Sequence, residues 1–269
     1  GFSVPAILLT LGLQVIISLF IWRAVVRKTA NPFQPLLQRW EAIALFFILI
    51  LTQHALLWDL WRGNYPDVSS HAPGSYNREP LLAVVHGGTL VIGLILLACA
   101  SAQPEQVRVE SLRLGFKNVG AIFSRSAVSL ALVLAVIAGA GTLLQTFTAL
   151  PASLPVLVTV AVNVLEVFLV LALLLEFCRL RHKRRALGFV ALWLFVLCVI
   201  PFILAGVLQS ENLARVSLLA PGFFALGDSH NPEWNRLYCT LLAHFLVVVL
   251  LFMGWWREWK RLLEHRWNR

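Results

Sequence analysis

The chain has 269 residues, of which 59% are hydrophobic and only 13% are charged, and its mean hydropathy is +0.80. Soluble domains carry roughly 25% charged residues, so this composition excludes a water-soluble globule, and the high hydrophobicity also excludes a disordered chain. We attribute the net charge of +9 to basic residues that flank membrane spans, and not to nucleic-acid binding. The composition therefore predicts a polytopic membrane protein.

Seven apolar stretches reach the length of about 20 residues that a helix needs to cross the hydrocarbon core. A short segment with a proline at each end separates the fourth and fifth stretches. We count them as two spans, because one crossing cannot hold about 50 apolar residues. The prediction is an all-α transmembrane helical bundle. In chain order, the predicted spans are residues 4–26, 41–60, 81–102, 127–150, 154–177, 186–208 and 237–256.

The basic residues alternate between the two sides of such a bundle. Most of the 22 Lys and Arg residues fall after the first, third and fifth spans and in the C-terminal tail, which share one side if there are seven spans. Because basic loops stay in the cytoplasm, we expect the N-terminus outside and the C-terminus in the cytoplasm. The expected location is the cytoplasmic (inner) membrane of a bacterium.

Two segments on the basic side are predicted to be more than linkers. Residues 31–40 are expected to form a helix that lies flat in the membrane interface. Residues 103–126 are expected to form an amphipathic cytoplasmic segment. In both, apolar residues recur at helical spacing: Phe33, Leu36, Leu37 and Trp40 in the first, and Val109, Leu112, Phe116, Val119 and Phe123 in the second.

The longest outer segment, residues 210–236, contains a short apolar stretch. Residues 220–227 read Ala-Pro-Gly-Phe-Phe-Ala-Leu-Gly, which is too short to cross a membrane. Two interpretations stay open. The stretch is either a re-entrant or interfacial element containing Ala220, Pro221 and Gly222, or an ordinary surface loop with anchoring aromatic residues.

Polar side chains inside the spans are the default candidates for function in a bilayer. Glu166 is the strongest, because it lies midway along the fifth span, with Asn163 on the same helical face. It either lines a substrate or ion path or is a protonated Glu bonded across a helix interface. His54, His86 and His244 lie on three different spans without metal-ligand spacing. We interpret them as interhelical hydrogen-bonding groups more readily than as metal or haem ligands.

The sequence contains no motif of a nucleotide site or a hydrolase. The patterns G-x-x-x-x-G-K-[ST], G-x-S-x-G and G-x-G-x-x-G are all absent. We interpret Gly87, Gly88 and Gly93 as positions of close helix packing, and the four cysteines show no metal or disulfide spacing. We therefore predict no catalytic residue, cofactor, metal site or enzyme activity.

Residues 31–269 resemble the permease domain of type-two ABC exporters. The resemblance consists of six spans with both ends in the cytoplasm, the segment 31–40 before them, the segment 103–126 between the second and third of them, and the stretch Leu218-Leu219-Ala220-Pro221-Gly222 before the last. Ala220-Pro221 stands where that family commonly has Ser-Pro. Residues 1–30 form an extra first span, which suggests the C-terminal part of a longer permease.

The resemblance implies a transport subunit of an ATP-driven exporter. Its partners would be a separate cytoplasmic ATP-binding subunit, a second permease unit in a dimer, and membrane lipid, but no nucleic acid. Two other functions stay open, a seven-helix membrane sensor and a secondary transporter or membrane enzyme that uses Glu166. By resemblance, the contact with the ATPase would be made by Glu105, Arg108, Leu112, Arg113, Phe116 and Lys117.

Overall fold

The computed structural model describes residues 4–31, 34–62, 78–101, 126–149, 153–182, 186–227 and 234–264. Every regular element in these ranges is helical, and seven helical spans within them are long and apolar enough to cross a membrane. This confirms the predicted all-α bundle, and the chain is a multi-pass membrane protein. The helices are α1 (Val4–Ala30), α2 (Arg39–Arg62), α3 (Arg78–Ala100), α6 (Ala127–Ala149), α7 (Leu154–His182), α8 (Ala186–Leu194), α9 (Ile200–Leu208), α10 (Glu211–Ala214), α11 (Ala220–Gly227) and α12 (Trp234–Glu264).

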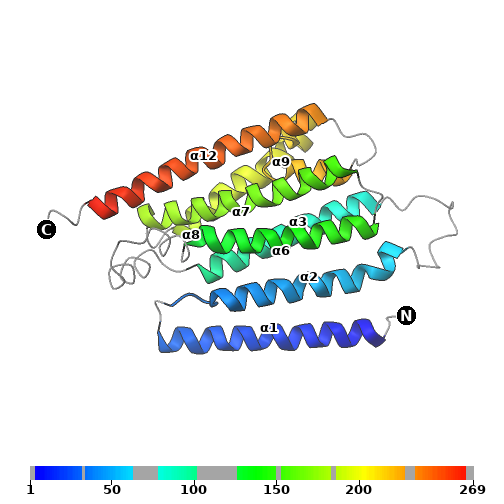
Figure 1. Cartoon of the computed structure of the whole chain (residues 1–269), viewed down its shortest axis with the longest axis horizontal. Coiled ribbons are helices and arrows are strands. Elements are labelled where there is room, and N and C mark those ends of the chain that lie inside the picture. The colour runs from blue at the N-terminus through cyan, green and yellow to red at the C-terminus, as the bar shows by residue number, and fades with distance from the viewer. Residues whose placement is uncertain are drawn as a thin grey trace.

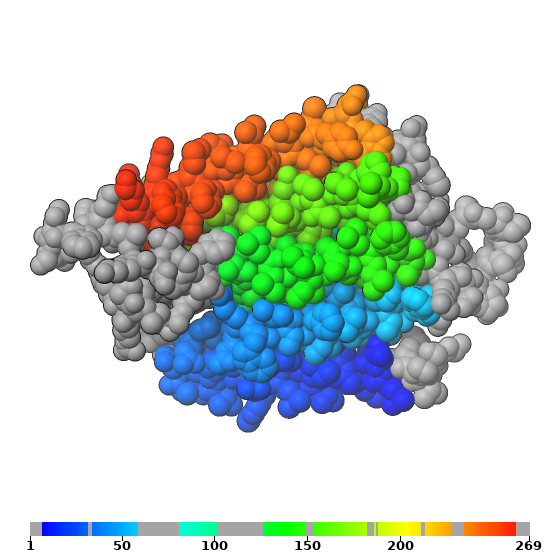
Figure 2. Space-filling view, in the orientation of Figure 1, coloured from blue at the N-terminus to red at the C-terminus, as the bar shows by residue number. Residues whose placement is uncertain are grey.

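Successive spans run in opposite directions through the bundle (Figure 1). Helix α1 forms one edge and α12 the opposite edge (Figure 2). Helices α1, α3, α7 and α12 all finish at the same end of the bundle, which we call the basic end (Figure 1). Basic residues of the described ranges gather there: Arg27, Lys28, Arg39, Arg179, Arg181, Arg257, Lys260 and Arg261.

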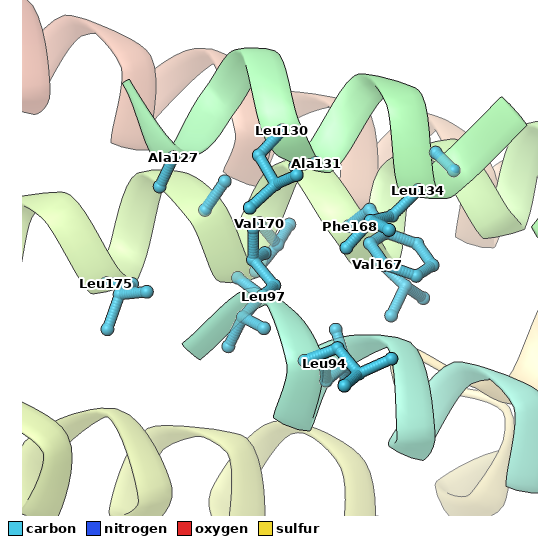
Figure 3. Packing of buried hydrophobic residues seen from close by; sticks show 14 of the residues in the cluster. Leu94, Leu97, Ala127, Leu130, Ala131, Leu134, Val167, Phe168, Val170 and Leu175 are labelled. Atoms are coloured by element: carbon cyan, nitrogen blue, oxygen red, sulfur yellow. The ribbon is translucent and has the colours of Figure 1, made fainter. Parts of the chain in front are cut away.

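Helix α7 lies at the centre of the bundle and packs against α3, α6, α8, α11 and α12. Its Phe168 is fully buried and its ring centroid lies 6.2 Å from that of Phe46 on α2. Leu97 of α3 and Leu134 of α6 belong to the same buried cluster as Val167 and Phe168 of α7 (Figure 3). Lipid tails are as apolar as these side chains, so close van der Waals packing holds such helices together.

Small residues permit the closest helix contact only at some of the predicted positions. A Cβ added to Gly93 would lie 2.3 Å from Cζ of Phe168, so α3 and α7 can approach only because this residue is glycine. At Gly87 and Gly88, a Cβ would meet no atom within 4 Å. The interpretation as close packing is therefore correct for Gly93 and wrong for the Gly87–Gly88 pair, where the residues leave open space.

The interfacial helix predicted for residues 31–40 is not formed. Its described residues before Arg39 are bends and coil, and α2 begins only at that residue. The carboxylate of Glu41 accepts the backbone N–H of Gln38 at 2.7 Å, which is one half of a capping box and fixes the start of α2. The backbone N–H of Leu37 donates to a carbonyl at the end of α3 at 3.2 Å. The segment is thus tied to the bundle as a capped linker.

The predicted span 186–208 is not one continuous α-helix. Helix α8 passes into a π turn, Phe195–Val199, before α9 begins. Pro201 explains this change, because its ring clashes with the carbonyl four residues earlier and it has no N–H to donate. The wider π turn accommodates the proline and leaves the carbonyl of Leu197 available to another part of the chain.

Candidate functional site

The chain turns back into the bundle after α9 instead of following its surface. Residues 215–222, which we call the re-entrant turn, follow α10 and lead into α11. Within them Ser217 and Leu218 are buried, and the N–H of Leu218 donates to the carbonyl of Leu197 at 3.0 Å. The segment from Leu197 to Leu208 is about 16 Å long. The turn therefore meets the broken span about halfway along it, a distance that corresponds to the middle of a hydrocarbon core of about 30 Å.

Irregular backbone at this depth is tolerated only where its polar groups are satisfied within the protein. Carbonyl groups in the π turn of the preceding span accept some of the hydrogen bonds that the re-entrant turn needs. The hydroxyl of Ser217 donates to the carbonyl of Cys198 at 2.9 Å, beside the bond between Leu218 and Leu197. The π turn and the re-entrant turn thus satisfy each other's backbone groups.

Asn163 of α7 provides the second attachment of the re-entrant turn. Its amide nitrogen donates to the carbonyl of Leu218 at 2.9 Å, and its amide oxygen accepts the N–H of Gly222 at 3.2 Å. The side chain is completely buried. Because a primary amide both donates and accepts, one residue fixes both ends of the curve from the turn into α11.

Two ionisable side chains face each other next to this attachment. Oε2 of Glu166 on α7 lies 3.7 Å from Nδ1 of His244 on α12, and both residues are more than nine-tenths buried. Neither atom has a hydrogen-bond partner within the described ranges. The other ring nitrogen of His244 lies 3.5 Å from the carbonyl of Val216 in the re-entrant turn. The pair therefore connects α7, α12 and the turn.

His86 of α3 lies against the re-entrant turn from a third helix. Its Nδ1 lies 3.4 Å from the hydroxyl of Thr142 on α6, and its Nε2 has no hydrogen-bond partner in the described part of the chain. A Cβ added to Gly222 would lie 2.6 Å from Nε2 of His86 and 2.7 Å from the amide oxygen of Asn163. Only glycine fits where the turn passes between these two side chains.

The predicted intramembrane candidates thus meet at one depth. Helices α3, α7 and α12 begin at the same end of the bundle (Figure 1). His86, Asn163, Glu166 and His244 lie about 12 to 18 Å along their helices from that end. We call these four residues, together with the re-entrant turn, the mid-membrane polar cluster.

His54 is the candidate that the structure does not bring into this cluster. It is half-buried on α2, and its ring lies 5.3 Å from that of Trp58. Its neighbour Gln53 points towards α3, where the hydroxyl of Thr89 donates to the Gln53 amide oxygen at 3.1 Å. The residue on α2 whose side chain bonds to α3 is therefore Gln53, which sequence reasoning missed because an amide attracts less attention than an imidazole.

A half-open groove with a volume of about 240 Å³ lies beside the cluster, between α3, α9 and α11. The open space at Gly87 and Gly88 forms its floor on α3. The rings of Phe202 and Phe223 meet edge to face on its other side, 5.7 Å apart. Its lining is otherwise apolar: Ala83, Val84 and Leu219, with His86 at the edge of the polar cluster.

The candidates for contact with an ATPase, from Glu105 to Lys117, all lie outside the described residues, and of the predicted segment 103–126 only Ser126 is described. Among the residues that the structure describes, no group of three His, Cys, Asp or Glu side chains is placed to hold a metal ion. Comparison of the chain with known protein families, with curated proteins and with solved structures found no match.

Proposed function

We propose that the chain is an integral membrane transport subunit, the permease of an ATP-driven exporter in the cytoplasmic membrane of a bacterium. The observation that supports this best is the buried re-entrant turn between the last two spans, held at mid-membrane by Asn163 and by the π turn. Broken helices and re-entrant backbone at the bilayer midplane recur in transport proteins, where they form or gate a path.

In this proposal the basic end of the bundle faces the cytoplasm, since loops rich in Lys and Arg are retained there. Residues 103–126 would contact a separate ATP-binding subunit at that end, and two permease units would form the complete transporter. A tag inserted at Ser69 tests the orientation. It should be accessible only from outside the cell, and labelling from the cytoplasmic side would contradict the orientation.

The coupling to ATP is tested with the chain purified from its native membrane and reconstituted in nanodiscs. The preparation should contain a subunit with a Walker-type sequence and should hydrolyse ATP. Reversing the charges of Arg108 and Lys117 should lower the hydrolysis rate about ten-fold, a usual size for coupling between sites. Reversing Arg236, at the other end of the bundle, is the matched control and should leave the rate unchanged. An ATP hydrolysis rate that stays the same when the charges of Arg108 and Lys117 are reversed would count against the proposal.

A second function is favoured by one specific observation. The buried pair of Glu166 and His244 has unpartnered atoms facing each other at mid-membrane within the described ranges, and intramembrane ionisable pairs occur in proton relays and ion paths. A secondary transporter or membrane enzyme would use this pair directly and would need no ATPase. The two candidates separate cleanly, because Glu166→Gln abolishes turnover of the second while ATP hydrolysis by the first continues.

A further inference from the structure

We propose that Glu166 and His244 together bind one exchangeable proton, and that this proton holds the re-entrant turn in place. The proposal concerns the state of the turn and does not rest on the transport function. Three elements meet at the pair: α7 carries Glu166, α12 carries His244, and the turn contributes the carbonyl of Val216.

The hydrogen-bonding chemistry decides which atom carries which hydrogen. A backbone carbonyl only accepts, so the contact of His244 Nε2 with the carbonyl of Val216 requires a hydrogen on Nε2. In neutral imidazole, Nδ1 then bears the lone pair, and this is the atom that faces Oε2 of Glu166. A lone pair and an ionised carboxylate repel each other. One further proton between the two atoms removes this repulsion, and a hydrogen bond forms when the side chains close the 3.7 Å gap between them.

That proton has two equivalent arrangements. On Oε2, a neutral carboxylic acid donates to Nδ1 of His244; on Nδ1, an imidazolium donates to the carboxylate of Glu166. Transfer between the two atoms leaves the number of protons and the net charge unchanged. Removal of the proton leaves a buried carboxylate opposite a lone pair, and addition of a second leaves a buried imidazolium without a counter-charge. The neutral, singly protonated pair is therefore the state that the buried site favours.

Few other ionisable groups face the pair. Within the described ranges, α6, α8, α9 and α11 contain no acidic or basic residue. On α3 the facing group is His86, which contacts Thr142 instead. Arg215 is the first residue of the turn, and its guanidinium lies 5.2 Å from the ring centre of Phe224. The turn also contacts Cys198, whose carbonyl accepts the hydroxyl of Ser217.

The link from proton to turn runs through the imidazole of His244. One ring nitrogen faces Glu166 and the other contacts Val216, so a movement of the ring away from an ionised Glu166 also withdraws the donor from the turn. The attachments at Asn163 and at the π turn do not involve an ionisable side chain. The proton therefore acts as an adjustable attachment of the turn.

The thiol of Cys198 provides a reporter within the chain itself. In a chain whose Cys99, Cys178 and Cys239 are replaced by Ala, a small membrane-permeant thiol reagent should label the buried Cys198 faster when the turn that contacts its backbone carbonyl lifts. Labelling rates are measured in nanodiscs from mildly acidic to alkaline pH. The ratio of each rate to that of Glu166→Gln removes the titration of the thiol itself, because the Gln amide donates to Nδ1 at every pH.

The expected result is a ratio near one at acidic pH that rises about ten-fold at alkaline pH, as a local opening becomes populated. The infrared band of a protonated carboxylic acid should disappear over the same pH range and should be missing in Glu166→Gln. Glu176→Gln, a buried carboxylate on the same helix away from the turn, is the control and should keep the wild-type pH dependence.

Failure of either half of the result overturns the proposal. If the carboxylic acid band of Glu166 is lost while the labelling ratio stays flat, the proton does not hold the turn. If the ratio rises but the band persists in Glu166→Gln, another group is responsible. A band and a ratio that both stay constant show that the pair binds no exchangeable proton. Loss of the candidate transport function in any variant does not enter these readouts.

Discussion

The backbone of Gly222 lies between the side chains of Asn163 and His86, and its N–H donates to the Asn163 amide oxygen at 3.2 Å. The contact is close on both sides, because a Cβ would approach each side chain to 2.7 Å or less. This one position thus joins α3, α7 and α11 at mid-membrane, and a larger residue there should lower the stability of the chain.

Gly222→Ala should destabilise the chain by about 1–3 kcal/mol, the usual cost of overpacking a tight interior. Gly206 of α9 is the matched control, since a Cβ there meets no atom within 4 Å. Gly206→Ala should be neutral or slightly stabilising, as alanine favours a helix. Thermal unfolding in detergent measures both. Equal stability of the two variants would show that the turn does not pass between Asn163 and His86.

Asn163→Leu removes a donor and an acceptor at once and leaves the carbonyl of Leu218 and the N–H of Gly222 buried without partners. Each orphaned group costs about 1–3 kcal/mol, so the variant should unfold well below the wild-type temperature. Thr159 lies one helical turn earlier, is equally buried, and its hydroxyl has no partner in the described part of the chain. Thr159→Val should therefore change stability little, and a similar loss in both variants would contradict the role of Asn163.

Two glycines on α6 give a test of the helix packing. A Cβ at Gly141 would lie 2.5 Å from Cγ2 of Ile50 on α2, whereas a Cβ at Gly139 would meet nothing within 4 Å. Gly141→Ala should cost about 1–3 kcal/mol, and Gly139→Ala should be neutral. Thermal unfolding should also show that replacing Ile50 by Ala costs less in the Gly141→Ala chain than in the wild type. The same cost in both chains would mean that α2 and α6 are not in contact at this point.

Glu176 joins three helices at the basic end. Its carboxylate accepts the first backbone N–H of α6, at Ala127, and the indole N–H of Trp255 on α12. Glu176→Ala should cost about 2–4 kcal/mol, because it removes a buried charged cap and leaves both donors unpartnered. Trp255→Phe removes one donor only and should cost less. Glu258→Ala, which breaks the exposed pair with Arg261, should cost less than about 1 kcal/mol, and chemical denaturation ranks the three.

The sequence was enough to predict the spans, because seven apolar runs stand out from the segments between them. It also identified four members of the polar cluster, since Glu166, Asn163, His86 and His244 are conspicuous in apolar surroundings. Periodicity does not say which helix faces meet. That is why Gln53 was missed in favour of its neighbour His54, and why the common depth of the cluster was visible only in the structure.

The other differences have local causes. The π turn arises because Pro201 removes one hydrogen bond, and it persists because the re-entrant turn uses the freed carbonyl. A pattern of apolar residues cannot reveal such a distant partner. The prediction of an interfacial helix was wrong for a similar reason. The hydrogen bond from Gln38 to Glu41 caps α2, which begins at Arg39, and helical spacing alone does not reveal a cap.

The most direct test of the account is a disulfide between the re-entrant turn and the broken span. Ser217→Cys is introduced into the chain whose remaining native thiol is Cys198, because the Ser217 hydroxyl lies 2.9 Å from the carbonyl of that residue and a disulfide requires Cα atoms within about 7 Å. Mild oxidation in nanodiscs should join the introduced thiol to Cys198 in nearly every chain, whereas Ser210→Cys should not react. Absence of that disulfide, or efficient bonding from position 210, would show that the turn does not enter the middle of the bundle.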